Sequence, residues 1–174
     1  VVAVPGRSRR SELAGMTGAD PGKRWVLLSF TTLELSDEAL DRVERHGETE
    51  FFVVRPLEFR RRNIHAVDRE RMPFSDVLAS CDVVISKPGY GLISECVVND
   101  KPLIYADRSD FKEYAVLVEA LRRWLVNLHI PSAELYRGEL ADALGRIGHQ
   151  PRPCERMGAG GDRLAARRLL SFAG

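Results

Sequence analysis

The amino-acid sequence predicts a single α/β domain of the Rossmann-like kind, in which helices cover both faces of a mostly parallel sheet. Short apolar segments of strand length alternate along the chain with amphipathic segments of helical period. Most of the strand-like segments are apolar at every position, as expected for strands that are buried on both faces. The length of 174 residues suits one domain with a real core and is too short for two ordinary domains.

The first half of the chain supplies three of the expected strands. Residues 1–23 have no clear apolar period and are interpreted as a lead-in with a short helix at 11–16, so that the domain itself covers 24–174. Ser36 is placed to cap a helix that runs to about His46. The other predicted elements of this half are the strands RWVLLSF (24–30), EFFVVRP (50–56) and NIHAVD (63–68) and the helix FSDVLASC (74–81), with Ser75 or Asp76 as its cap.

The second half continues the alternation of strand and helix. An amphipathic helix over 111–123 is predicted from the helical spacing of its apolar side chains. The other predicted elements are the strands DVVIS (82–86), PLIYA (102–106) and WLVNL (124–128), a helix of about ten residues after the first of these, a helix around Leu140, Leu144 and Ile147, and a last helix over 162–172 with Ala165, Leu169 and Phe172 on one face. In parallel sheets of this kind, ligands bind in the loops beyond the carboxyl ends of the strands.

Composition excludes several classes of partner. Lys and Arg total 26 against 25 Asp and Glu, so the formal charge of +1 gives no reason to expect a nucleic acid. No apolar run approaches the roughly 18 residues of a membrane span, and no signal peptide is evident. Cys81, Cys96 and Cys154 are scattered, and the first two lie in apolar runs, so reduced core cysteines and a cytoplasmic location are expected. Val1 in place of Met suggests a fragment or a processed chain.

The turn KPGYG at 87–91 is the strongest candidate for a binding site. Gly89 and Gly91 allow positive φ and a close approach of the backbone to a ligand. The free N–H groups of the helix that follows, near Leu92, would point out of the sheet edge and attract a phosphate or diphosphate. Glu95, one turn further on, is suited to the two hydroxyls of a ribose. The same residues also fit a plain strand-to-helix turn, because a glutamate in a first turn is favoured by the helix dipole alone.

Two kinds of nucleotide site agree with this turn. The stretch VVISKPGYGLIS resembles the dinucleotide fingerprint G-x-G-x-x-G with Ser94 in the third glycine position, and Asp107 ends the next strand as a ribose-binding acid would. Against that interpretation, the third glycine is absent and the turn follows the fourth predicted strand instead of the first. The other kind is a nucleotide-sugar site.

Residues 82–120 resemble the donor-binding segment of GT-B glycosyltransferases. The shared pattern is a strand, a basic residue (Lys87), a small-residue turn, Ser94-Glu95 on a helix, and a strand that begins at Lys101-Pro102. The chain is similar to the peptidoglycan lipid I N-acetylglucosaminyltransferase and to predicted glycosyltransferases related to the N-terminal part of plant arabinose kinases. The resemblance extends over about 24–172, and it implies one half of a GT-B fold. The sequence departs from the family at Thr31-Thr32, where glycines are usual.

The resemblance also implies a role for individual residues around a bound donor. The implied contacts are Gly89, Tyr90, Gly91, Leu92, Thr31 and Thr32 for the diphosphate, Ser94 and Glu95 for the ribose, Met72, Pro73 and Phe74 beside the base, Asp110, Lys112 and Glu113 for the sugar, and Lys87 and Arg108 close by.

The expected function is therefore transfer of a sugar from a nucleoside diphosphate sugar, first of all a UDP-sugar, to an unknown acceptor. No cofactor is expected, and no metal, because the four histidines lack ligand spacing. The catalytic base is expected in an N-terminal acceptor-binding domain or a separate subunit, without which the chain would be inactive. The alternatives are a non-catalytic sugar-nucleotide binding module, an NAD(P)-dependent oxidoreductase that requires Asp107, and half of a nucleotide-sugar 2-epimerase.

Overall fold

The computed structural model describes residues 1–109 and 111–172, and in this part of the chain a six-stranded sheet runs in the order β3-β2-β1-β4-β5-β6. Every neighbouring pair of strands is parallel. This order and direction confirm the predicted Rossmann-like α/β domain. The strands are β1 (Arg24–Ser29), β2 (Thr49–Val54), β3 (Ile64–Val67), β4 (Val83–Ser86), β5 (Leu103–Ala106) and β6 (Asn127–Ile130).

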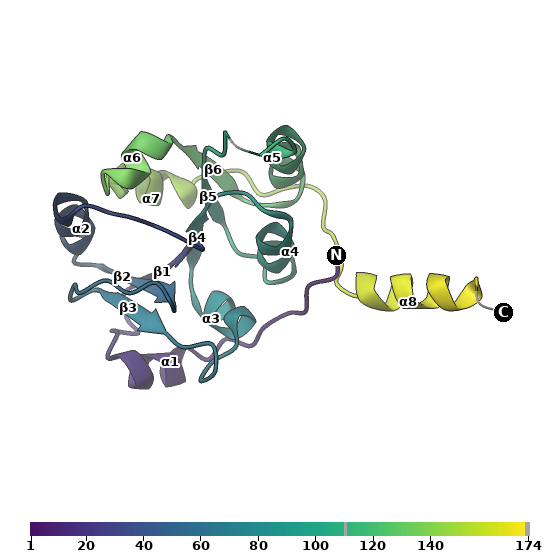
Figure 1. Ribbon diagram of the computed structural model, residues 1–174, viewed down its shortest axis with the longest axis horizontal. Coiled ribbons are helices and arrows are strands. Elements are labelled where there is room, and N and C mark those ends of the chain that lie inside the picture. Colours follow the sequence, from purple (N-terminus) through teal and green to yellow (C-terminus); the bar gives the residue numbers. More distant parts are fainter. Residues whose placement is uncertain (110, 173–174) are drawn as a thin grey trace.

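Helices form a layer on each face of the sheet (Figure 1). Alternate strand residues point to opposite faces, so Trp25 and Leu27 belong to one buried cluster while Val26 and Leu28 belong to the other. The first cluster is covered by α1 (Arg10–Thr17), α3 (Phe74–Ser80), α4 (Tyr90–Val98) and α5 (Tyr114–Trp124), and the second by α2 (Asp37–Glu44), α6 (Ser132–Tyr136) and α7 (Ala141–Ile147).

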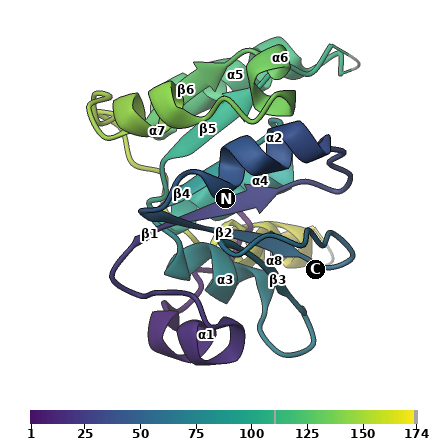
Figure 2. The same ribbon diagram turned by 90° about the vertical axis from the view of Figure 1, so that its left-hand side faces the viewer.

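The predicted lead-in, residues 1–23, packs against the domain. Its short helix is α1, which lies beside α3 in Figure 2, and Leu13 from this helix is fully buried in the core. The Arg10 guanidinium lies 4.2 Å from the ring centroid of Trp25 and donates to the Asp82 carboxylate, with Nη1 and Oδ1 3.0 Å apart. Residues 10–17 therefore brace the amino ends of β1 and β4.

Several local predictions are confirmed. The Ser36 hydroxyl accepts a hydrogen bond from the backbone N–H of Ala39 and caps α2 as expected. Cys81 and Cys96 are free and fully buried, and burial raises the pKa of both thiols, so they are unreactive core residues.

Two local predictions are wrong, and one helix was missed. Pro73, not Ser75 or Asp76, precedes the first residue of α3, and no side chain caps this helix. The sixth strand begins at Asn127 instead of Trp124, because Asn127 Nδ2 donates to the carbonyls of Leu121 and Leu125 and closes the end of α5. The five-residue helix α6 was not expected at all.

The last helix, α8 (Gly161–Ser171), extends away from the domain (Figure 1), and none of its residues is buried. The apolar side chains are open to solvent, with exposed fractions of 71% for Leu169 and 87% for Phe172. Its first residue is tied to the N-terminus, because the Gly161 N–H donates to the Val1 carbonyl over 2.8 Å. In the part of the chain that the structure describes, no helix is long and apolar enough to cross a membrane.

Candidate functional site

The candidate site lies where the chain leaves β1 and β4 in opposite directions. These two strands are neighbours and end in register at Ser29 and Ser86, and the Ser86 hydroxyl donates to the Ser29 carbonyl. After β1 the chain turns toward α2 on one face, and after β4 it turns toward α4 on the other. Such a divergence of loops opens a crevice at the carboxyl edge, which is where ligands bind in open parallel sheets.

The turn after β4 leaves the start of α4 open. Gly89 precedes the first helical residue, Tyr90, and no side chain caps the helix. The first backbone N–H groups of an α-helix have no partner within the helix, so those of Tyr90, Gly91 and Leu92 are available to a ligand. A side chain at Gly91 would meet nothing within 4 Å, so the space beside these groups is empty. The nine residues of α4 add the positive end of a helix dipole.

The expected use of positive φ at this turn is wrong. Gly89 has an extended backbone with φ −155° and ψ 147°, and Gly91 does not have a positive φ. Both conformations are open to residues with side chains. What the glycines provide here is a backbone without side chains at the start of α4, with open space beside Gly91.

Arg108, from the loop after β5, adds a cation to this turn. Its Nη1 donates to the Pro88 carbonyl over 3.1 Å and lies 3.8 Å from the position that a side chain at Gly89 would take. The guanidinium also lies 4.2 Å from the ring centroid of Phe111, which fixes its orientation. A helix terminus and a guanidinium beside it form a site for an anion.

Glu95 is a half-buried acid one turn into α4. Burial raises the pKa of its carboxyl above the usual value, because the charged form loses hydration. Its Oε2 atom is buried and has no hydrogen-bond partner among the described residues. A buried acceptor without a donor is costly, and this cost would be relieved if the carboxylate turned toward a hydroxyl donor.

Other residues expected at the site are spread along the same edge. Thr31, Thr32, Lys112 and Glu113 are exposed, and Ser94 is half-buried on α4. In the segment beside the expected base, Pro73 is exposed and Phe74 is half-buried, whereas the Met72 side chain is fully buried in the core and does not reach the surface. Asp110 lies outside the described residues.

Asp107 is already engaged by the protein. Its Oδ1 lies 2.7 Å from Nε2 of His129, and its Oδ2 accepts the backbone N–H of Ser132 over 3.1 Å. The N–H of Ser132, followed by His129, holds the pKa of this carboxyl below its ordinary value. Oδ1 is therefore paired with β6 and Oδ2 with the start of α6, so Asp107 is less available to a ribose than a carboxylate without partners would be.

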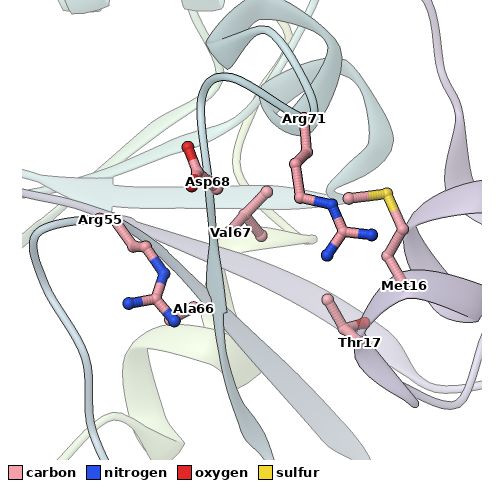
Figure 3. A pocket seen from close by; sticks show the side chains of 7 residues that line it. All are labelled: Met16, Thr17, Arg55, Ala66, Val67, Asp68 and Arg71. Carbon is pink, nitrogen blue, oxygen red and sulfur yellow. The ribbon is translucent and has the colours of Figure 1, made fainter.

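Two hollows open at the carboxyl edge. The first, of about 190 Å³, lies at the ends of β2 and β3 beside the end of α1. Figure 3 shows the Arg71 guanidinium directed toward Met16 and Thr17, with Arg55 on the far side of Asp68. The second hollow, of about 370 Å³, is lined by Thr32, Glu34 and Tyr136.

Sequence reasoning missed Tyr136, because it missed α6. The segment has a recognisable start and end, however. Pro131 stands directly before its first residue, and Gly138 follows its end with a φ of +71°. A proline before and a glycine after a short segment is a signal for a helix, and it could have indicated this one.

The order of the sheet and the placement of its helices are those of one half of a GT-B glycosyltransferase. Several solved structures are similar to this chain. Among them are the glycosyltransferase SnogD from Streptomyces nogalater (TM-score 0.52, 15% identity, 88% of this chain and 44% of that one), the spinosyn forosaminyltransferase SpnP (TM-score 0.51, 19% identity, 83% and 40%) and the calicheamicin glycosyltransferase CalG4 (TM-score 0.51, 15% identity, 74% and 34%). This chain therefore spans less than half the length of each. No protein-family model and no curated protein matches the sequence.

Proposed function

We propose that this chain is the donor-binding half of a glycosyltransferase that uses a nucleoside diphosphate sugar, first of all a UDP-sugar. The observation that carries the proposal is the open start of α4 with two groups placed beside it. Arg108 lies on one side of the turn, where it would meet a diphosphate. The Glu95 carboxylate, whose Oε2 is buried without a partner, lies one turn further on and would turn to accept the hydroxyls of a ribose.

These groups supply the chemistry that such a donor needs. The acceptor oxygen forms a bond to the anomeric carbon, the bond from that carbon to the diphosphate oxygen breaks, and the nucleoside diphosphate leaves with the electron pair. The backbone N–H groups of Tyr90 to Leu92 and the Arg108 guanidinium would stabilise the negative charge that develops on the leaving diphosphate. The helix terminus and guanidinium take the part that a divalent cation plays elsewhere, so we propose donor binding without a metal.

A second half would complete the enzyme. The similar structures are more than twice as long as the part that this chain covers. Helix α8 presents Leu164, Leu169, Leu170 and Phe172 to solvent, with exposed fractions between 62% and 87%, and another domain would cover such a surface. We propose that this half binds the acceptor and carries the catalytic base, so that the present chain binds a donor without transferring the sugar.

The engaged state of Asp107 favours this function over an NAD(P)-dependent oxidoreductase. That alternative needs a free carboxylate for the ribose, whereas His129 and Ser132 occupy the two oxygens. A non-catalytic binding module or half of a 2-epimerase would bind the same ligand. A transfer assay in the presence of the second half separates these alternatives from a glycosyltransferase.

The test is isothermal titration calorimetry of this chain with UDP, GDP, UDP-sugars and NAD(P)H in EDTA. We expect one nucleoside diphosphate to bind preferentially, and Glu95→Ala to weaken that binding by about tenfold, the equivalent of about 1.4 kcal/mol. Glu119→Ala, which removes an exposed glutamate of α5, is the matched control. The proposal would be contradicted if NAD(P)H bound with the same affinity to the original chain and to Glu95→Ala. It would also be contradicted if the nucleoside diphosphate bound equally well to Glu95→Ala and to Glu119→Ala.

A further inference from the structure

The hollow lined by Thr32, Glu34 and Tyr136 adjoins the turn that begins α4. Lys87 makes the connection, because it directly precedes Pro88-Gly89 and its Nζ lies 5.6 Å from the ring centroid of Tyr136. A diphosphate held at the turn would therefore have one end beside Lys87 and the hollow.

The start of α6, the helix that carries Tyr136, is held by the end of β5. Asp107 accepts the backbone N–H of Ser132 through Oδ2 over 3.1 Å, and its main-chain carbonyl accepts the Ser132 hydroxyl over 3.3 Å. His129 holds the other carboxylate oxygen of Asp107. The first residue of α6 is thus fixed to the same sheet edge as the α4 turn.

The end of α6 is fixed against α2. Gly138 has a φ of +71°, and a side chain there would lie 2.3 Å from the Ala39 carbonyl oxygen. The Arg42 guanidinium donates to the Arg137 carbonyl over 2.9 Å. A helix of five residues does not persist by itself, so these contacts at both ends are what keep Tyr136 beside the hollow.

The residues of the hollow have the chemistry of a sugar site. The aromatic ring of Tyr136 offers an apolar face, and its side chain is partly exposed. The Glu34 carboxylate and the Thr32 hydroxyl offer acceptors for sugar hydroxyls. A volume of about 370 Å³ lies within the usual range for small-molecule sites, and Glu34 would repel a phosphate group.

The hollow lies on the opposite layer from the proposed nucleoside contacts. The segment 72–74 leads into α3, which packs with α4 on one face of the sheet. Tyr136 belongs to α6 on the other face, beside α2 (Figure 1). A nucleoside diphosphate sugar laid across the carboxyl edge, with its diphosphate on the α4 turn and its nucleoside toward α3, would place its sugar ring in the hollow.

We propose that the hollow formed by Thr32, Glu34 and Tyr136 holds the sugar ring of the donor. Tyr136 packs against one face of the ring, and Glu34 accepts hydrogen bonds from its hydroxyls. This inference rests on the proposed function, and it assigns the sugar to the loop after β1 and to α6 instead of to the loop after β5, where Lys112 and Glu113 lie.

The test compares the affinities for UDP and for a UDP-sugar by isothermal titration calorimetry. UDP-glucose, UDP-galactose and UDP-N-acetylglucosamine are titrated first, and the tightest of the three is the probe. We expect Tyr136→Ala and Glu34→Gln each to weaken binding of the probe by about tenfold while the affinity for UDP changes less than about twofold. Tyr136→Phe, which keeps the ring, and Glu119→Gln, which removes a distant charge, should leave both affinities unchanged.

The outcomes separate this inference from the function on which it rests. If the probe binds more tightly than UDP and Tyr136→Ala does not affect that difference, the sugar lies elsewhere and the inference is overturned, while the proposed function stands. If the probe binds no more tightly than UDP and neither Tyr136→Ala nor Glu34→Gln weakens its binding, the hollow contributes nothing to donor binding and the inference is likewise wrong. If UDP, GDP and all three probes fail to bind, both proposals fall.

Discussion

The Arg108 guanidinium donates a hydrogen bond to the Pro88 carbonyl, with Nη1 and the oxygen 3.1 Å apart. This bond joins the loop after β5 to the turn after β4, so that a cation stands beside the free N–H groups of α4. Two strand ends thus contribute to one anion site.

Replacing Arg108 by alanine is expected to weaken binding of a nucleoside diphosphate by about tenfold, because one charge-assisted contact to the diphosphate is lost. Arg108→Lys should recover only part of the affinity, since an ammonium group cannot reproduce the planar fork of a guanidinium. Calorimetric titration with UDP measures both effects. Arg122→Ala, on an exposed part of α5, is the control, and an equal loss in that variant would mean that only overall charge matters.

Gly91→Ala is expected to raise the stability of the protein and to weaken its binding of UDP. A side chain there meets nothing within 4 Å, so the variant should fold and gain about 0.5 kcal/mol from better helix propensity. The added methyl group would obstruct the approach of a diphosphate to the backbone and weaken UDP binding. Gly145→Ala in α7 has the same open surroundings and should be stabilised without any change in binding. Urea denaturation and titration on both variants give the comparison, and undiminished UDP binding in Gly91→Ala would place the ligand elsewhere.

Glu95→Gln is expected to raise the free energy of unfolding, and the size of this increase should depend on pH. Burial raises the folded-state pKa of Glu95 above 4.5, so the folded protein binds more protons than the unfolded chain between these two values. The cost of the ionised carboxylate therefore develops as the pH rises from 4.5 through the folded-state pKa, and it is complete above that pKa. We expect the variant to be more stable at pH 8, by no more than about 1 kcal/mol because solvent screens a half-exposed carboxylate, and to lose most of that advantage near pH 4.5. Urea unfolding across this range is the measurement, with Glu119→Gln, which changes an exposed glutamate of α5, as the control.

Removal of α8 should leave the domain intact. No residue of this helix is buried, so a chain that ends at Gly160 should have a free energy of unfolding within about 0.5 kcal/mol of the original. By contrast, Leu13→Ala in α1 should cost about 2 to 5 kcal/mol, because Leu13 is fully buried. A large loss on removing α8 would show that it packs on the domain in solution. Both changes can be followed by chemical denaturation.

The sheet was predictable because its signals are local and strong. Segments such as Val26–Leu28 and Val83–Ile85 are apolar at every position, and a parallel strand covered on both faces requires this. The turn at Gly89 was predictable for a related reason, since an apolar strand that is followed by glycines and a helical segment indicates a strand-to-helix turn. The site roles assigned around this turn stay predictions.

What escaped prediction depends on contacts distant in sequence. The five residues of α6 carry too little local preference to form a helix, and they do so because Asp107 and Arg42 hold the two ends. The start of β6 depends on the side chain of Asn127 closing α5. Contacts of this kind are set by the assembled fold. Pro131 and Gly138 mark where α6 could begin and end, but they do not report what holds it in place.

The sheet separates the two helical layers that meet at its carboxyl edge, with α3 and α4 on one layer and α6 on the other. Side chains of α6 can therefore change without repacking the helix that begins at the glycine turn. On the arrangement proposed above, preference for a sugar and preference for a base would be inherited and altered separately. Exchange of the segment 131–138 between related chains would then be a practical way to change the donor sugar while the nucleotide contacts stay the same.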